Sequence, residues 1–477
     1  MTKNIPPSSY IFPAILCLVV IVFAQTAPDA LCRWLFQAAD AYPVMHTVLL
    51  VLFICLPLLW LVFSKEWKSA DIPTRVLLVG TAIYLVSTAY DILYSRNGTI
   101  LFLCCVGIFF LYKRKVYKPT LLIYLFIAYF VLHAVSLLWA DDVPFGLNIL
   151  TRYLPILTSV AFCFFRLERE HIRRMMLVFF RAMELFIFIS LLFWVCANVV
   201  LEFNLTDWFV FKKTTLNGAV SYATIYTWTN YLHPTFNAFS CMIAVGFGFF
   251  LFGDRKSNIT VTWLDLLLIA FGALLLALVT QSRTGFVQII AVCLSGSVWL
   301  LRKHRNIQIA ATIVLFIGAV ASGILLHDKI ALFLNDHTRE QLHVTALHAI
   351  QERPLLGTGI GGMYAVLESD AIAGELGYEH ALKKGLGNPH HQFIGDWMQT
   401  GIAGFLLIVW LTLLLFWEAI KRKNFPLFIF LIALFPLMQI EMPFNVLKST
   451  LLVIPFIHLL VQFGMDDTTS IGLRKKR

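Results

Sequence analysis

Two adjacent histidines, His390 and His391, stand directly before an apolar run that begins near Gly395. A neutral imidazole can take a proton from a hydroxyl group at physiological pH, because an ordinary histidine titrates near about pH 6.5. A histidine at the boundary between membrane and water also lies where an amphiphilic substrate would lie. The pair is therefore our first candidate for general-base chemistry.

Metal binding is the alternative interpretation of these histidines, with His343, His380 and nearby carboxylates as further ligands. Catalytic zinc sites usually take three protein ligands from compact motifs. His343 and His348 come close to such a motif, but no H-x-x-x-H pair with a carboxylate is present. We expect no metal and no other cofactor.

Two arginines form a second candidate group. Arg283 lies between two apolar runs in Ser282-Arg283-Thr284-Gly285, and Arg339 begins a helical pattern. Guanidinium groups suit phosphate because they offer a planar fork of donors and stay charged. Two such groups at the membrane surface could bind a lipid-linked pyrophosphate. The alternatives are that Arg283 only anchors a helix end in the headgroup region and that Arg339 only pairs with a neighbouring carboxylate.

Arg152 is a further candidate for the phosphate site, because Thr151-Arg152-Tyr153 begins an apolar run from its outer side. Arg181 and Glu184 lie three residues apart, so they can pair on one helix face. We interpret that pair, and Asp265, as structural.

Composition shows which elements must position these residues. Of the 477 residues, 59% are hydrophobic and 13% are charged, whereas about 25% are charged in soluble proteins. Apolar runs long enough to cross a bilayer recur along the chain, and they predict an all-α bundle of about 12–14 membrane helices. A β-barrel is excluded because runs such as 44–63 are apolar on every side. The predicted runs are 10–27, 44–63, 76–92, 99–112, 119–139, 149–165, 175–200, 233–252, 259–279, 286–301, 307–326, 399–418, 425–440 and 450–464.

The net charge of +10 is spread over alternate loops, so it does not indicate nucleic-acid binding. By the positive-inside rule the basic loops are cytoplasmic, and both termini face inward. The long segment 327–398, which carries most of the candidate residues, then lies on the non-cytoplasmic side. We predict three parts: membrane helices in 1–326, a large periplasmic loop at 327–398 that carries the site, and membrane helices with a basic tail in 399–477. The basic loops contain Lys65–Arg75, Lys113–Lys118, Arg166–Arg174, Arg255–Lys256, Arg302–Arg305, Lys421–Lys423 and Arg474–Arg477.

The long outer segment is not disordered in composition. Apolar residues recur at helical spacing in Arg339–Glu352, and Pro354 ends that pattern. The glycine-rich stretch Leu356–Gly362 follows, which predicts tight turns with close approach of the backbone.

Three motifs resemble those of the O-antigen ligase and polymerase family of membrane glycosyltransferases. The stretch from Arg339 to Gly362 is similar to the family's "R…PLLGxGxG" core, and His390–Gly404 is similar to its "HN…ETGLxG" segment. Ser282–Gly285 is similar to its "SRxG" turn, and His233-Pro234-Thr235 resembles a variant found in some members. The resemblance covers about residues 230–420 and is closest to O-antigen ligases.

The resemblance implies that two periplasmic arginines bind an undecaprenyl pyrophosphate-linked glycan and that one histidine activates the acceptor. Carried over by position, these are Arg283, Arg339 and His390, with Arg152 and His233 as further substrate-binding candidates. His391 stands where asparagine is usual. It is the alternative base, and we assign it to positioning the loop. The implied reaction transfers the glycan to a sugar of the lipid A core at the periplasmic face of the inner membrane, without a metal and with inversion.

Three alternatives remain from the sequence. An O-antigen polymerase and a ligase that glycosylates pilin-like proteins differ from the first hypothesis only in the acceptor. A transporter of lipid-linked sugars is a different class, for which we would expect a pseudo-repeat and ionisable residues at the membrane midplane. Neither feature is evident, and the partners that we expect are the lipid-linked donor, the acceptor and membrane lipids.

Overall fold

The structure is a computed structural model. It describes residues 43–90, 92–200, 234–254, 261–280, 282–303, 337–367 and 388–465, together with a few isolated positions. Every regular element in these ranges is a helix, which confirms the predicted all-α class. The chain divides into two compact units.

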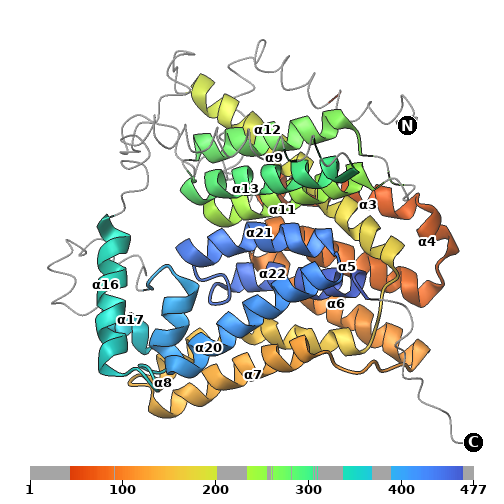
Figure 1. The fold of residues 1–477 in the computed structure, drawn as a ribbon. Helices are drawn as coiled ribbons and strands as arrows, with labels where there is room; N and C mark the ends of the chain where they lie inside the picture. Colours follow the sequence, from red (N-terminus) through yellow and green to blue (C-terminus); the bar gives the residue numbers. More distant parts are fainter. Residues whose placement is uncertain are drawn as a thin grey trace, which may run out of the picture. The chain divides into compact units, whose positions relative to one another are not determined.

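The first unit comprises residues 1–105 and 168–317. Helix α9 contacts α3, α5, α11 and α12, and α11 also contacts α12 and α13. Helices α11, α12 and α13 run alongside one another (Figure 1). The core of the unit is therefore built on α9 and α11. Its elements are α3 (Pro43–Val62), α4 (Lys65–Ser69), α5 (Ile72–Tyr90), the first part of α6 (Ile92–Lys113), α9 (Arg169–Val200), α11 (Pro234–Gly253), α12 (Trp263–Val279), α13 (Arg283–Leu300) and η6 (Leu301–Lys303).

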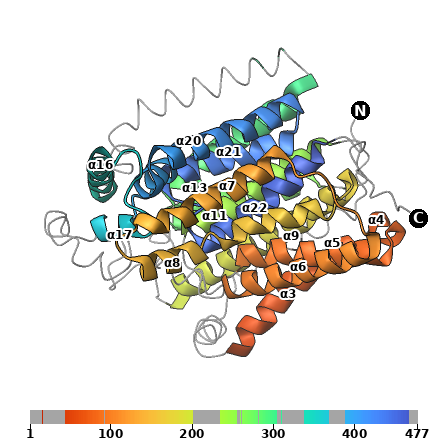
Figure 2. The same cartoon turned by 90° about the horizontal axis from the view of Figure 1, so that it is seen from below.

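The second unit comprises residues 106–167 and 318–477. Helix α20 is central, with contacts to α7, α16, α17 and α21, while η3 contacts α7 and α22. Helices α7 and α20 run side by side, and α16 crosses near the beginning of α20 at a steep angle (Figures 1 and 2). The elements are the rest of α6, α7 (Leu121–Val135), η2 (Ser136–Trp139), α8 (Val143–Thr151), η3 (Leu154–Cys163), α16 (His337–Glu352), α17 (Gly362–Leu367), α20 (Gln392–Lys421), α21 (Phe425–Ile440) and α22 (Leu447–Phe463).

The protein is a polytopic membrane protein. Among the described residues, seven helices are long and apolar enough to cross a membrane, or eight if the bent pair α8 and η3 forms one span. Shorter apolar helices account for the other predicted runs within the described ranges. The predicted runs 10–27 and 307–326 lie almost wholly outside the described residues. The predicted extent of the outer segment, 327–398, is described only in part and stays a prediction.

One predicted run differs from the structure. The sequence suggested a continuous span over 149–165, but α8 and η3 meet there at a bend of 42°. Pro155 explains the bend, because proline has no N–H to donate to the carbonyl of Thr151 one turn earlier. Arg152 lies at the bend as the C-cap of α8.

The two parts of α20 differ in their surroundings. Its first turns are mostly buried, from Gln392 to Gly401. Beyond Gly401, four large side chains recur at helical spacing and are exposed by 52–63%. An apolar stripe of this kind on a membrane helix faces lipid. These residues are Leu406, Trp410, Leu413 and Trp417.

A buried charged cluster joins α9 to α12 in the first unit. Arg181 Nη1 donates to Glu184 and to Asp265 at 2.6 Å each, and Arg181 Nη2 lies 3.3 Å from the second oxygen of Asp265. Asp265 also accepts hydrogen bonds from the backbone and side chain of Thr262, at the N-terminus of α12. The structural role expected for these residues agrees with this geometry.

We expect Arg181→Ala to destabilise the protein by about 3–5 kcal/mol, because two carboxylates stay buried without their cation. The unfolding temperature of the purified protein in detergent measures this loss. Glu184→Gln is the matched control, since it leaves the paired contacts of Arg181 with Asp265 in place, and it should cost much less. Equal unfolding temperatures for Arg181→Ala and the wild type would contradict a structural role for the cluster.

Candidate active site

The side chains of His390 and Glu441 are in hydrogen-bond contact within the second unit. His390 directly precedes the His391 cap of α20, and Glu441 is the C-cap of α21. Nδ1 of His390 lies 2.9 Å from Oε2 of Glu441, and the two side chains are 12% and 4% exposed. An ionised carboxylate can only accept, so Nδ1 is the donor, and in the neutral imidazole Nε2 keeps its lone pair. No described residue forms a hydrogen bond with Nε2.

A tight turn holds His390 in place. Its φ of 48° lies in the left-handed region, which few residues other than glycine adopt. The side chain of Asn388 accepts a hydrogen bond from the backbone N–H of His390 at 2.8 Å. Such a turn is typical of asparagine two residues before the donor. The strain of about 1–3 kcal/mol is of the kind found at functional sites.

His391 has different surroundings. Its Nδ1 accepts a hydrogen bond from the backbone N–H of Ile394 at 3.3 Å, so the ring caps the N-terminus of α20. Burial lowers the pKa of His391 to about 4, the positive charge of His343 acts in the same direction, and a hydrogen bond with Gln439 opposes both. Nδ1 can accept only while it is unprotonated. The geometry therefore gives His391 the features of a capping residue and His390 those of a base.

The rings of His343 and His391 meet edge to face, with 5.6 Å between their centroids. Within the described part of the chain, no three His, Cys, Asp or Glu side chains come together as metal ligands. His380, the other histidine considered for metal binding, lies outside the described residues.

Helix α20 is broken at Gly401. This residue has φ 68° and ψ −163°, a conformation that only glycine adopts readily. A Cβ added there would lie 2.0 Å from the carbonyl oxygen of Leu355. The N–H of Ile402, which follows the break, donates to the carbonyl of Pro354 at 3.0 Å. The break is thus built around the proline-leucine turn that follows α16.

The glycine-rich stretch satisfies the other backbone groups at the break. The N–H of Thr358 donates to the carbonyl of Met398 at 2.8 Å, and the N–H of Gly359 donates to Gln399 at 3.0 Å. Thr358 Oγ1 also donates to Met398, at 3.0 Å. Two stretches singled out in the sequence, Leu356–Gly362 and His390–Gly404, therefore contact each other, and these bonds fix the first turns of α20.

The predicted substrate-binding residues do not all lie in the same unit, and not all of them are described. Arg152 lies in the unit of the histidines, where Nη1 is 3.2 Å from the hydroxyl of Tyr364. Arg339 lies in the first turn of α16, which contacts α20, but its side chain is outside the described ones. Arg283 is the first residue of α13 in the other unit. His233 lies outside the described residues.

The serine and glycine beside Arg283 have a structural explanation. Ser282 caps α13 by accepting a hydrogen bond from the N–H of Gly285 at 3.2 Å. An added Cβ at Gly285 would lie 3.0 Å from Ala238 and 3.1 Å from Ala277, so glycine lets three helices approach. These contacts fix the helix end from which Arg283 projects.

Comparison with known families identifies the region that holds these features. Residues 266–409 match the family model described as O-antigen ligase, Wzy_C. This match supports the O-antigen ligase family that the sequence motifs indicated. No curated protein matches the chain. That family consists of enzymes of the lipid-linked glycan ligase and polymerase type, and the match supports a function of this type.

The matched region contains the break of α20, both expected arginines and His390, but it ends before Glu441. Reasoning from the sequence missed Glu441. The available signal was a carboxylate directly after the apolar run 425–440, at the end that the charge pattern places outside. An ionisable residue at such a position is a candidate for function.

Proposed function

We propose that this enzyme is an O-antigen ligase, which moves a glycan from undecaprenyl pyrophosphate to a sugar hydroxyl of the lipid A core. The observation that carries the proposal is the contact between His390 and Glu441, because it leaves Nε2 of His390 as a proton acceptor. The family match supports a lipid-linked glycan as the donor and an acceptor in the membrane.

The reaction starts with proton transfer from the acceptor hydroxyl to Nε2 of His390. The acceptor oxygen attacks the anomeric carbon from the face opposite the pyrophosphate, and the bond from that carbon to the pyrophosphate oxygen breaks. The product is inverted at the anomeric centre. Glu441 stabilises the imidazolium that forms, as a carboxylate does in other base dyads. The proton leaves His390 for water before the next cycle.

Arg283 and Arg339 bind the pyrophosphate in this proposal. Their charge stabilises the negative charge that grows on the leaving group as the bond breaks. Pyrophosphate is a good leaving group, so no metal or other cofactor takes part. Arg152 and His233 are further substrate-binding candidates; the contact of Arg152 with Tyr364 gives its guanidinium a fixed position beside α17.

We place this chemistry on the periplasmic face of the bacterial inner membrane. The support is the alternation of basic and non-basic loops, which assigns the segment around 327–398 to the outer side. The His390 and Glu441 pair favours an enzyme over a transporter of lipid-linked sugars.

A strain that lacks the gene tests the ligase assignment. We expect its lipopolysaccharide to carry no polymer on the core, while lipid-linked polymer accumulates. A single repeat unit on the core would instead identify an O-antigen polymerase. Normal lipopolysaccharide with unglycosylated pilin-like protein would identify a protein O-oligosaccharyltransferase, the third acceptor class.

We expect Arg283→Ala and Arg339→Ala each to lower kcat/KM by about 10²-fold or more, since each removes a donor that stabilises developing charge. Lysine at either position should keep part of the activity, because a point charge replaces only part of a forked donor. Arg302→Ala, on a loop that the charge pattern places inside, is the control and should act like the wild type. Well-expressed alanine variants with wild-type turnover would remove both residues from the donor site.

A further inference from the structure

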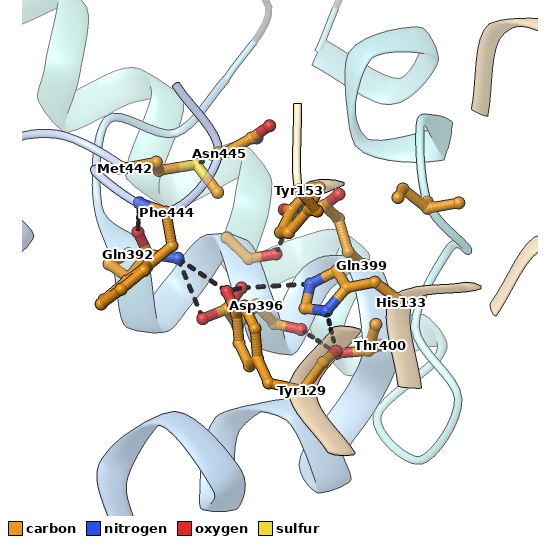
Figure 3. A network of polar contacts seen from close by, with 12 residues as sticks. Tyr129, His133, Tyr153, Gln392, Asp396, Gln399, Thr400, Met442, Phe444 and Asn445 are labelled. Carbon is orange, nitrogen blue, oxygen red and sulfur yellow. Dashed lines mark hydrogen bonds and ion pairs between the residues drawn. The ribbon is translucent and has the colours of Figure 1, made fainter. Parts of the chain in front are cut away.

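Gln392, the first residue of α20, joins two segments of the second unit. Its Oε1 accepts a hydrogen bond from the backbone N–H of Phe444 at 3.0 Å. Its Nε2 lies 3.0 Å from Oδ2 of Asp396 (Figure 3). A backbone N–H can only donate and a carboxylate can only accept, so both contacts require the same orientation of the amide.

Asp396 in turn is held by a hydroxyl donor from α7. Its side chain is fully buried, and its Oδ1 accepts from the hydroxyl of Tyr129 at 2.8 Å. Nε2 of His133 lies 3.4 Å from the same oxygen, an ion-pair distance. Nδ1 of His133 lies 2.9 Å from the carbonyl of Tyr129 and must donate there. A buried carboxylate with these partners has a fixed position, and it fixes Gln392 (Figure 3).

Gln392 lies two residues after His390, and Phe444 lies three residues after Glu441. The turn between α21 and α22 is itself compact, because the N–H of Asn445 donates to the carbonyl of Met442 at 2.9 Å. One side chain therefore connects the segment that carries the base with the segment that carries its carboxylate.

We propose that Gln392, held by Asp396, is a positioning residue that sets the contact between His390 and Glu441. The inference rests on the proposed function, since it assigns the pair to proton transfer. Gln392 is fully buried, so we assign it no contact with the substrate. Its hydrogen bond with Phe444 fixes the position of the α21–α22 turn, which carries Glu441, relative to the beginning of α20.

Titratable groups from several elements surround Asp396 and His390. Tyr129 and His133 approach Asp396 from α7. The hydroxyl of Tyr153, which directly precedes η3, lies 3.4 Å from the side-chain amide nitrogen of Gln399. Glu441 faces His390. A change at Gln392 therefore reaches the base through the turn that carries Glu441.

The test is a double-mutant cycle in the purified, full-length enzyme with Gln392→Met and Glu441→Gln. The assay uses an undecaprenyl pyrophosphate-linked glycan as donor and lipid A core as acceptor. Methionine keeps the approximate length of glutamine but removes its three hydrogen bonds, with Phe444, Asp396 and the hydroxyl of Tyr129. We expect Gln392→Met to lower kcat by about 10- to 100-fold with KM nearly unchanged, because small displacements of a catalytic group have effects of that size.

Two further results distinguish positioning from a general loss of structure. In the Glu441→Gln background, Gln392→Met should have little additional effect on kcat. Both single variants should also move the acid limb of the kcat/KM profile to lower pH, because the imidazolium loses the carboxylate that stabilises it. Thr412→Val, which removes a buried hydroxyl farther along the same helix, should change neither quantity.

The outcomes separate the two hypotheses. Full activity of Glu441→Gln and of His390→Ala would refute the base assignment itself. If both lose activity but the effect of Gln392→Met is equally large with and without Glu441, the base assignment stands and the positioning role is wrong. Tyr129→Phe removes the hydroxyl that donates to Asp396 and accepts from Gln392 but leaves the bond between Gln392 and Phe444 in place. It provides the same cycle if Gln392→Met does not fold, and it should show a smaller effect of the same kind.

Discussion

Replacement of His390 by alanine is expected to reduce turnover by about 10²- to 10⁴-fold, the contribution typical of a general base. The reason is that Nε2 of His390 is the proton acceptor that the contact with Glu441 leaves open. Binding of the lipid-linked donor should stay largely intact, because the proposal assigns donor binding to Arg283 and Arg339. The measurement is kcat of the purified variant with defined donor and acceptor, together with donor binding at equilibrium.

His391→Ala is the matched comparison. It should cost less activity, because His391 caps α20 at Ile394 and is not assigned to proton transfer. Activity of the wild type should survive EDTA, since no metal takes part in the proposed reaction, and it should fall at acid pH as the base is protonated. If His391→Ala is inactive and His390→Ala is active, the two roles are reversed. If both are active, histidine base catalysis is wrong.

Gly401→Ala should have the largest effect on the fold. The added Cβ would lie 2.0 Å from the carbonyl oxygen of Leu355, and alanine does not readily adopt φ 68° with ψ −163°. The sum of backbone strain and overlap is at least about 2–4 kcal/mol. We expect a large drop in the unfolding temperature in detergent and loss of transfer activity.

Gly107→Ala is the control for that experiment. Gly107 lies in α6, and an added Cβ there meets no atom within 4 Å. Alanine in a helix interior is favoured over glycine by about 0.5–1 kcal/mol, so this variant should be as stable as the wild type or slightly more so. A Gly401→Ala protein that unfolds like Gly107→Ala would show that the break does not depend on glycine.

The membrane helices could be predicted because each needs a long apolar run in lipid, and composition alone reveals such runs. Pro155 was a sequence signal for the break between α8 and η3. However, an apolar run that contains one proline can form either a kinked span or two helices. The choice between these depends on what satisfies the freed carbonyl groups, which is a property of the packed structure.

The site was predictable only in its residue types. Adjacent histidines before a membrane helix indicated a base, but the two differ through contacts that sequence does not show: a carboxylate 51 residues away for His390 and a backbone N–H for His391. Gln392 and Asp396 look like ordinary polar residues at a helix start. Their role depends on Phe444 and Tyr129, which are distant in the chain.

The break at Gly401 also has a mechanical consequence for α20. Lipid offers no hydrogen bonds, so an interruption in a membrane helix persists only where protein groups replace those that are lost. Here the carbonyls of Met398 and Gln399 and the N–H of Ile402 are all satisfied by the stretch Pro354–Gly359. The part of α20 before Gly401 is thus anchored to that stretch, while the part after it carries the lipid-facing stripe. We therefore expect that a change in bilayer thickness tilts the second part by bending α20 at Gly401, and that the contact between His390 and Glu441 stays unchanged.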